Sequence, residues 1–268
     1  MTATALVALN VFRESVRDKV LYNLVVFAVL LMAASYLLGQ LSAGQDIKII
    51  KDLGLAAISA FGLAIAVFIG IGLVWKEVEK RSIYSLLSKP ISRPQLVLGK
   101  YAGILLTLLV NLAVMTVAFY AELAYMHWIS GPEARAHWTV PAIDPRMLLA
   151  VVMIGIELAL VTAIALFFST FSSPFLSALL TVGLWVIGQF SADFRELGTF
   201  LDSPVAGWMG RVLYYTLPNF AGFDIKAQVV SGTPVSASYI ALMSLYGVVY
   251  VSLVLVAAVA IFNRRDFK

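Results

Sequence analysis

Residues 147–168 read MLLAVVMIGIELALVTAIALFF, a run in which Glu157 is the only charged side chain. An α-helix needs about 20 predominantly apolar residues to cross the roughly 30 Å hydrocarbon core of a bilayer. Backbone polar groups cannot stay unpaired in lipid, so such a run predicts a transmembrane helix. Five similar runs surround it, at residues 20–38, 53–75, 96–123, 175–194 and 239–262. We therefore predict an all-α integral membrane protein with six transmembrane helices.

The composition of the whole chain agrees with this fold class. Of its 268 residues, 61% are hydrophobic and 13% are charged, whereas soluble domains carry about 25% charged residues. No cysteine is present, which excludes disulfides and thiolate metal sites. The first apolar run is not followed by a small-residue cleavage site, so we expect it to remain in the protein. Residues 1–268 are predicted to form one transmembrane domain.

Basic side chains are concentrated in segments that share one side of the membrane if both termini are cytoplasmic. Because Lys and Arg favour short cytoplasmic loops, their distribution indicates the orientation. The cytoplasmic side would hold 12 of the 19 basic residues, namely Arg13, Arg17, Lys19, Lys76, Lys80, Arg81, Lys89, Arg93, Lys100, Arg264, Arg265 and Lys268. We predict a multi-pass protein of the cytoplasmic (inner) membrane with both termini in the cytoplasm.

Two segments outside the six runs also contain many apolar residues, the first on one helical face and the second along most of its length. In residues 1–19, the side chains of Leu9, Phe12 and Val16 share one helical face, which predicts an amphipathic elbow helix in the membrane interface. A helix packed on its own bundle is the alternative. Residues 195–238 are apolar but interrupted by Pro and Gly, which predicts external re-entrant or interfacial helices between spans five and six. A folded external cap is the alternative there.

The loop between spans two and three, residues 76–95, reads KEVEKRSIYSLLSKPISRPQ. Charges crowd its first six residues, and an apolar patch at helical spacing follows. Pro90 and Pro94 are expected to end the helix and return the chain to the membrane. A short amphipathic helix of this kind docks into a groove of a partner protein or lies on lipid headgroups. The residues alone leave both interpretations open.

No motif for catalysis or for nucleotide binding is visible. The Gly-Lys pair at 99–100 looks like the end of a phosphate-binding loop, but Tyr101 follows it and Pro94 stands where the first glycine is needed. His127 and His137 are each followed by Trp and have no third ligand, which favours residues at a membrane interface over a metal site. We predict no catalytic residue, no metal and no cofactor in this chain.

Glu157 lies near the middle of the fourth span. A charged carboxylate in hydrocarbon costs a few kcal/mol, so it needs a partner, water or a proton. We favour a structural hydrogen bond to Asn111 or Thr107 in span three. A substrate or proton site formed by Glu157 with Asn111 is kept as the alternative.

These stretches together resemble the permeases of type-2 ATP-binding-cassette (ABC) exporters, and within them the branch related to multicopper-enzyme maturation. The resemblance covers nearly the whole chain in order, and the loop is its most specific part. The matching pieces are EVEKRS (77–82), LLSKPISR (86–93), LGKYAG (98–103), FSTFSSP (168–174), LPNF (217–220) and FNRRDF (262–267).

The resemblance implies a coupling helix at residues 77–87 that seats in a cleft of a separate ABC-type ATPase subunit. Its contact residues would be Glu77, Glu79, Lys80, Arg81, Ile83, Tyr84 and Leu87. It also implies two permeases, as two copies of this chain or as this chain with a homologue, and an ATPase dimer that holds ATP and magnesium. Lipid and accessory membrane or periplasmic proteins are further expected partners, and nucleic acid is not.

The leading functional prediction is the membrane subunit of an ATP-driven exporter. One alternative is an ion-coupled secondary transporter that uses Glu157, which the absence of a visible internal repeat disfavours. Another is ATP-driven mechanical work on a membrane or periplasmic partner. The eight Met residues show no Met-x-x-Met clustering, so the sequence shows no copper path.

Overall fold

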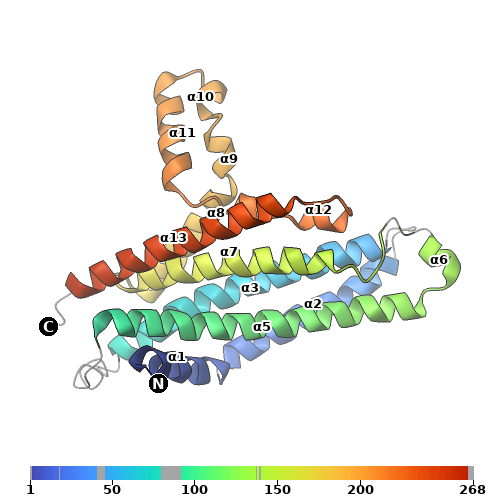
Figure 1. The fold of residues 1–268 in the computed structure, drawn as a ribbon, viewed down its shortest axis with the longest axis horizontal. Coiled ribbons are helices and arrows are strands. Elements are labelled where there is room, and N and C mark those ends of the chain that lie inside the picture. Colours follow the sequence, from blue (N-terminus) through green and yellow to red (C-terminus); the bar gives the residue numbers. More distant parts are fainter. Residues whose placement is uncertain are drawn as a thin grey trace.

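The computed structural model describes residues 2–17, 19–40, 46–79, 92–136, 138 and 140–264, and every regular element in these residues is a helix. This confirms the all-α class for the described part of the chain. Five long helices run alongside one another and form the body of the fold (Figure 1). They are α2 (Lys19–Gln40), α3 (Asp46–Glu79), α5 (Arg93–Ile129), α7 (Arg146–Ser169) and α13 (Ala237–Arg264).

Four of the described helices are by themselves long and apolar enough to cross a membrane. Their apolar spans are Ile47–Ile71, Arg93–Ile129, Arg146–Ser169 and Ala237–Asn263. A fifth candidate is the pair formed by α1 (Ala3–Val16) and the Leu21–Ser35 part of α2, which meet at a bend of 59°. The protein is therefore a multi-pass membrane protein with four to five such spans in its described residues, where the sequence predicts six.

The predicted fifth span, residues 175–194, differs from the structure. The helix α8 (Pro174–Gln189) has 16 residues and ends at Phe190, and a separate short helix, α9 (Ser191–Phe194), follows it. At 1.5 Å per residue α8 is about 24 Å long, less than the thickness of a bilayer core. At this end the carbonyl oxygen of Gly188, which lacks a partner within the helix, accepts a hydrogen bond from the N–H of Phe220 at 3.1 Å. Hydropathy does not report that tertiary pairing.

Small side chains allow α3 and α7 to pack closely. A Cβ at Gly70 would stand 2.7 Å from the Cβ of Ala165, and a Cβ at Gly62 would clash with Leu158. Between them Ala66 is fully buried. Without a hydrophobic driving force between helices in lipid, such close contact is a main source of helix association. The α3–α7 pair is therefore a centre of the packed core.

The helices α9, α10 (Leu197–Phe200) and α11 (Pro204–Thr216) form a hairpin that projects away from the long helices (Figure 1). Pro204 begins α11 behind the N-cap Ser203, a position that tolerates proline because the first N–H groups of a helix are unpaired anyway. The chain then returns through the 3-10 helix η1 (Ala221–Phe223) and α12 (Lys226–Val230). The prediction of short helices in residues 195–238 is borne out in outline, while their place relative to a membrane stays a prediction.

Different helix ends meet at the two ends of the bundle. The N-terminus, the end of α3, the start of α5 and the end of α13 lie toward one end, whereas α12 and α6 (Pro132–Ala136) lie toward the other (Figure 1). Residue 2 and the end of α13 at Arg264 therefore lie toward the same end of the bundle as the end of α3 and the start of α5. The compartment on that side stays a prediction.

The N-terminal helix packs on its own bundle through a different face from the predicted apolar one. Val11 and Ser15 of α1 are buried, whereas Val16 is exposed. The buried face lies against α5, where Gly99 and Gly103 permit close approach. Small residues on the partner helix, and not hydrophobicity alone, decide which face is buried.

Candidate functional site

Polar side chains that are candidates for a functional role gather in two places in the structure. We call them the loop end and the polar pocket. The loop end consists of the last turn of α3, the first turn of α5 with Arg93, and the last turn of α13. The polar pocket lies between α3, the end of α8 and the η1–α12 segment. The predicted coupling residues belong to the first, and Glu157 adjoins the second.

The predicted coupling loop is shorter than residues 76–95. The helix α3 continues to Glu79, and α5 already begins at Arg93. Glu77 and Glu79 lie in the last turn of α3, while residues 80–91 lie outside the described residues. That segment contains the other predicted contacts, Lys80, Arg81, Ile83, Tyr84 and Leu87, so the coupling helix stays a prediction.

The start of α5 shows the place of Pro94, while the expectation that Pro90 and Pro94 end a helix in the loop concerns residues outside the described part of the chain. Pro94 occupies the first turn of α5, where its missing N–H costs no hydrogen bond. The N–H of Ser92 donates to Oε1 of Gln95 at 3.1 Å, a side-chain contact typical of helix N-termini. The segment SRPQ therefore begins a helix directly after the loop.

Arg93 joins this first turn to the end of the last helix. Its Nη1 donates to the carbonyl oxygens of Phe262 and Asn263, at 3.1 and 3.0 Å. The last carbonyl groups of a helix have no partner within the helix, and the negative end of its dipole favours a cation there. The guanidinium of Arg93 therefore caps α13 from another helix.

The same part of α5 holds the N-terminal helix. A Cβ at Gly99 would stand 2.9 Å from the carbonyl oxygen of Thr4, and one at Gly103 would stand 2.5 Å from that of Ala8. These atoms belong to the α1 backbone and cannot move aside as a side chain could. The two helices are thus in direct backbone contact close to the exit of the loop.

Glu157 is almost fully buried, at 3% exposure, in the middle of α7. Its Oε1 accepts hydrogen bonds from Nε1 of Trp185 at 2.8 Å and from Nε2 of Gln189 at 3.0 Å. Both donors lie on α8. A structural hydrogen-bond partner was predicted correctly in kind, but its location in span three was wrong.

The residues expected to bond Glu157 satisfy their polar groups within α5. Nδ2 of Asn111 donates to the carbonyl oxygen of Thr107 at 2.8 Å, and Oγ1 of Thr107 donates to that of Gly103 at 3.0 Å. Such bonds one turn back are common for polar side chains inside helices. The structure therefore does not bring Asn111 and Glu157 together in a polar site.

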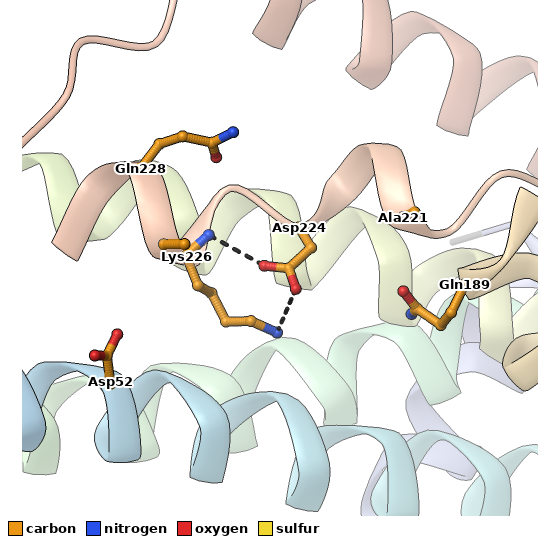
Figure 2. A pocket seen from close by; sticks show the side chains of 7 residues that line it. Asp52, Gln189, Ala221, Asp224, Lys226 and Gln228 are labelled. Carbon is orange, nitrogen blue, oxygen red and sulfur yellow. Dashed lines mark hydrogen bonds and ion pairs between the residues drawn. The ribbon is translucent and has the colours of Figure 1, made fainter. Parts of the chain in front are cut away.

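The polar pocket has a volume of about 460 Å³. Figure 2 shows Asp52 on α3 facing the segment that carries Asp224, Lys226 and Gln228, with Gln189 on another side. The Asp224 carboxylate accepts from the N–H of Lys226 at 3.1 Å, and its other oxygen lies 3.4 Å from Nζ of Lys226. Ion pairs and amides of this kind offer hydrogen bonds to water or to a polar solute.

Gln189 connects the polar pocket to the interior, because its side chain both lines the pocket and donates to Glu157. Nζ of Lys226 also lies 3.4 Å from Oγ of Ser59 on α3. The pocket therefore reaches from the α12 side of the bundle toward the middle of α7.

Sequence reasoning missed two buried polar contacts. Lys51 is fully buried on α3, and its Nζ donates to the carbonyl oxygen of Pro141 at 2.7 Å. Oγ of Ser35 on α2 donates to Oε1 of Glu122 on α5 at 2.6 Å. The only available signal was the presence of Lys51 and Glu122 close to the predicted edges of apolar runs, which pattern reading assigns to interfaces.

The described residues contain no group of three His, Cys, Asp or Glu side chains that could hold a metal ion. His127 lies beside Trp138, with ring centroids 6.2 Å apart, and His137 lies outside the described residues. The arrangement of His127 is that of an aromatic contact near the end of α5.

A family model described as "ABC-2 family transporter protein" matches residues 5–267, nearly the whole chain. No curated protein matches the chain. The match includes the loop end, the polar pocket and the hairpin alike.

Proposed function

The chain belongs to the ABC-2 transporter family, and on this premise we propose that it couples ATP hydrolysis by a separate ATPase subunit to transport or to mechanical work. The family supports an ABC permease as the membrane component of such a transporter. The match over residues 5–267 is the observation that carries the proposal. The sequence has no phosphate-binding loop of its own, so the ATPase would be a partner protein.

The loop end is the proposed docking place of this ATPase. Both ends of the second loop lie at the same end of the bundle as the termini (Figure 1). The charges of Glu77, Glu79, Lys80 and Arg81 precede an apolar patch in the loop sequence. A short helix with both properties suits insertion into a groove with charged rims. Ile83, Tyr84 and Leu87 are the proposed apolar contacts.

The proposal includes an assembly of two permeases with an ATPase dimer in the cytoplasmic (inner) membrane, with both termini and the loop end in the cytoplasm. Export is the proposed direction, and mechanical work on a membrane or periplasmic partner is kept beside it. The more specific resemblance, to permeases related to multicopper-enzyme maturation, stays a prediction. We propose no transported substrate on the basis of this resemblance.

Glu157 is proposed as a structural group and not as an ion carrier. Trp185 and Gln189 both donate to it, and this fixes the end of α8 against the middle of α7. A carboxylate buried in a span needs such partners. These hydrogen bonds account for the buried carboxylate without an ion, so no observation favours the ion-coupled alternative.

The experiment is co-purification from native membranes through a tag on this chain. We expect an ABC-type ATPase in the eluate of the wild type and its loss from the double variant Glu79→Lys, Arg81→Glu. A matched control, Glu196→Lys with Arg211→Glu, reverses two exposed charges on the hairpin and should keep the ATPase. An ATPase that stays bound to the loop variant would show that these charges do not dock it.

A further inference from the structure

Arg93 stands at the start of α5, where the second loop ends. Only Ser92 separates it from the segment that lies outside the described residues. Its guanidinium is bonded to the end of α13 through Phe262 and Asn263. Both bonds come from one nitrogen, Nη1, so this single group holds the carbonyl oxygens of two consecutive residues in the last turn of α13.

The other part of α13 holds the return leg of the hairpin. The hydroxyl of Tyr250 donates to the carbonyl oxygen of Thr216 at 2.7 Å, and the N–H of Asn219 donates to the hydroxyl of Tyr246 at 2.9 Å. Thr216 is the last residue of α11, and Asn219 precedes η1. These bonds lie about 18–24 Å along α13 from Phe262, at 1.5 Å per residue.

The hairpin is well suited to move as a unit. It projects from the body of the fold (Figure 1), and its apolar side chains such as Phe200, Val205 and Trp208 are exposed. Its two legs are joined at their base, because the N–H of Phe220 donates to the carbonyl oxygen of Gly188, and the first leg is held on α7 by the bond from Gln189 to Glu157. A shift of α13 would therefore pull on the return leg and, through Phe220, on the base of the hairpin, against the anchor on α7.

We propose that α13 is a transmission rod, which Arg93 couples at its C-terminal end to the loop and which Tyr246 and Tyr250 couple, near its middle, to the hairpin. This inference rests on the proposed function, since it names the path by which movement at the loop end reaches the hairpin. Arg93 acts as a positioning residue that makes the last turn of α13 follow the first turn of α5. The polar pocket adjoins the segment moved by the rod, because Asp224 follows η1 directly.

The absence of cysteine from the sequence makes the test direct, because two introduced cysteines carry the only spin labels on the chain. A label pair at the exposed residues Gln95 and Ala260 reports the junction of α5 with α13. A pair at the exposed residues Leu201 and Leu245 reports the hairpin against the rod. Distances are measured by electron–electron double resonance in lipid nanodiscs.

The first arm uses the permease alone and does not need the ATPase. We expect a narrow distance distribution for the 95–260 pair in the wild type and a distribution at least twice as broad in Arg93→Gln. Arg93→Lys keeps the positive charge but lacks the Nη1 group that makes both bonds, so its distribution should be intermediate. Equal widths in the wild type and in Arg93→Gln would overturn the coupling of α5 to α13.

The second arm uses the complex with the co-purifying ATPase, with and without Mg-ATP and vanadate. We expect a nucleotide-dependent shift of the 201–245 distance in the wild type and the loss of at least half of it in Arg93→Gln and in Tyr250→Phe. A full shift in both variants would overturn the transmission role and leave the proposed function intact. A wild-type preparation without an ATPase would overturn the proposed function, and transmission with it.

Discussion

The helices α7 and α13 are equally apolar in mean hydropathy, yet they occupy opposite environments. In their most apolar stretches 72% of α7 is buried by protein, against 22% of α13. In a membrane protein apolar side chains suit both lipid and a protein core, so hydropathy finds a span without telling which faces pack. The difference lies in neighbours such as Gly62 and Gly70, which bring α3 onto α7.

The largest contrast is expected from the same substitution on each helix. Leu158→Ala on α7, where Leu158 is 1% exposed, leaves a cavity and should destabilise the fold by about 2–5 kcal/mol. Leu253→Ala on α13, where Leu253 is 62% exposed, should cost less than about 0.5 kcal/mol, because surface positions away from packed features tolerate change. Reversible unfolding in mixed micelles measures both, and equal losses would contradict the burial difference.

A smaller loss is expected from overfilling the α3–α7 contact. Gly70→Val would push a side chain against the Cβ of Ala165, which cannot move without its backbone, and should cost about 1–3 kcal/mol. Gly183→Val on α8 is the matched control, since no atom lies within 4 Å of its added Cβ. Thermal stability in detergent measures the difference. A control that is destabilised as much as Gly70→Val would show that helix propensity, not packing, decides.

Glu157 contributes a polar contact to the packing of α7, because it accepts hydrogen bonds from two side chains of α8. Glu157→Leu removes the acceptor of Trp185 and Gln189 and should destabilise by about 1–2 kcal/mol. Glu157→Gln keeps an amide oxygen that can accept, so stability and ATP-dependent activity should stay near wild type. A folded Glu157→Gln protein without activity would instead favour the ion-coupled alternative.

The smallest effect is expected at the exposed helix. Tyr250→Phe removes one hydrogen bond to the carbonyl oxygen of Thr216, which is worth about 0.6 kcal/mol in membrane proteins. Global stability should hardly change, while amide exchange in Pro204–Thr216 should become faster. Tyr22→Phe, at an exposed tyrosine of α2, serves as control and should leave this exchange unchanged.

The sequence predicted α7 and α13 closely, since the 147–168 and 239–262 runs fall within the helices Arg146–Ser169 and Ala237–Arg264. These helices are continuous apolar runs whose lengths match a bilayer. It failed at α8, whose last turn is bonded through Gly188 to the backbone of the distant residue Phe220. A hydrogen bond between distant segments leaves no periodic pattern to read.

The candidate sites show the same limit. The position of Glu157 within a span predicts a hydrogen-bond partner, but nothing in the sequence indicates whether span three or α8 supplies the donor. Lys51 lies beside an apolar run and was assigned to an interface, although its side chain is buried against Pro141. Arg93 was counted as a loop charge, and its bonds to the end of α13 depend on the tertiary fold. Charges next to spans are therefore where sequence reading needs the structure.

ATP hydrolysis by protein purified through a tag on this chain tests the central claim most directly. The account predicts Mg-ATP hydrolysis in the wild-type preparation, its loss in the Glu79→Lys, Arg81→Glu preparation, and none in the chain expressed without its partner. The contrary result is hydrolysis by the chain alone, or ATP-independent transport by the purified chain. Either would show that the second loop is not where a separate ATPase drives this membrane protein.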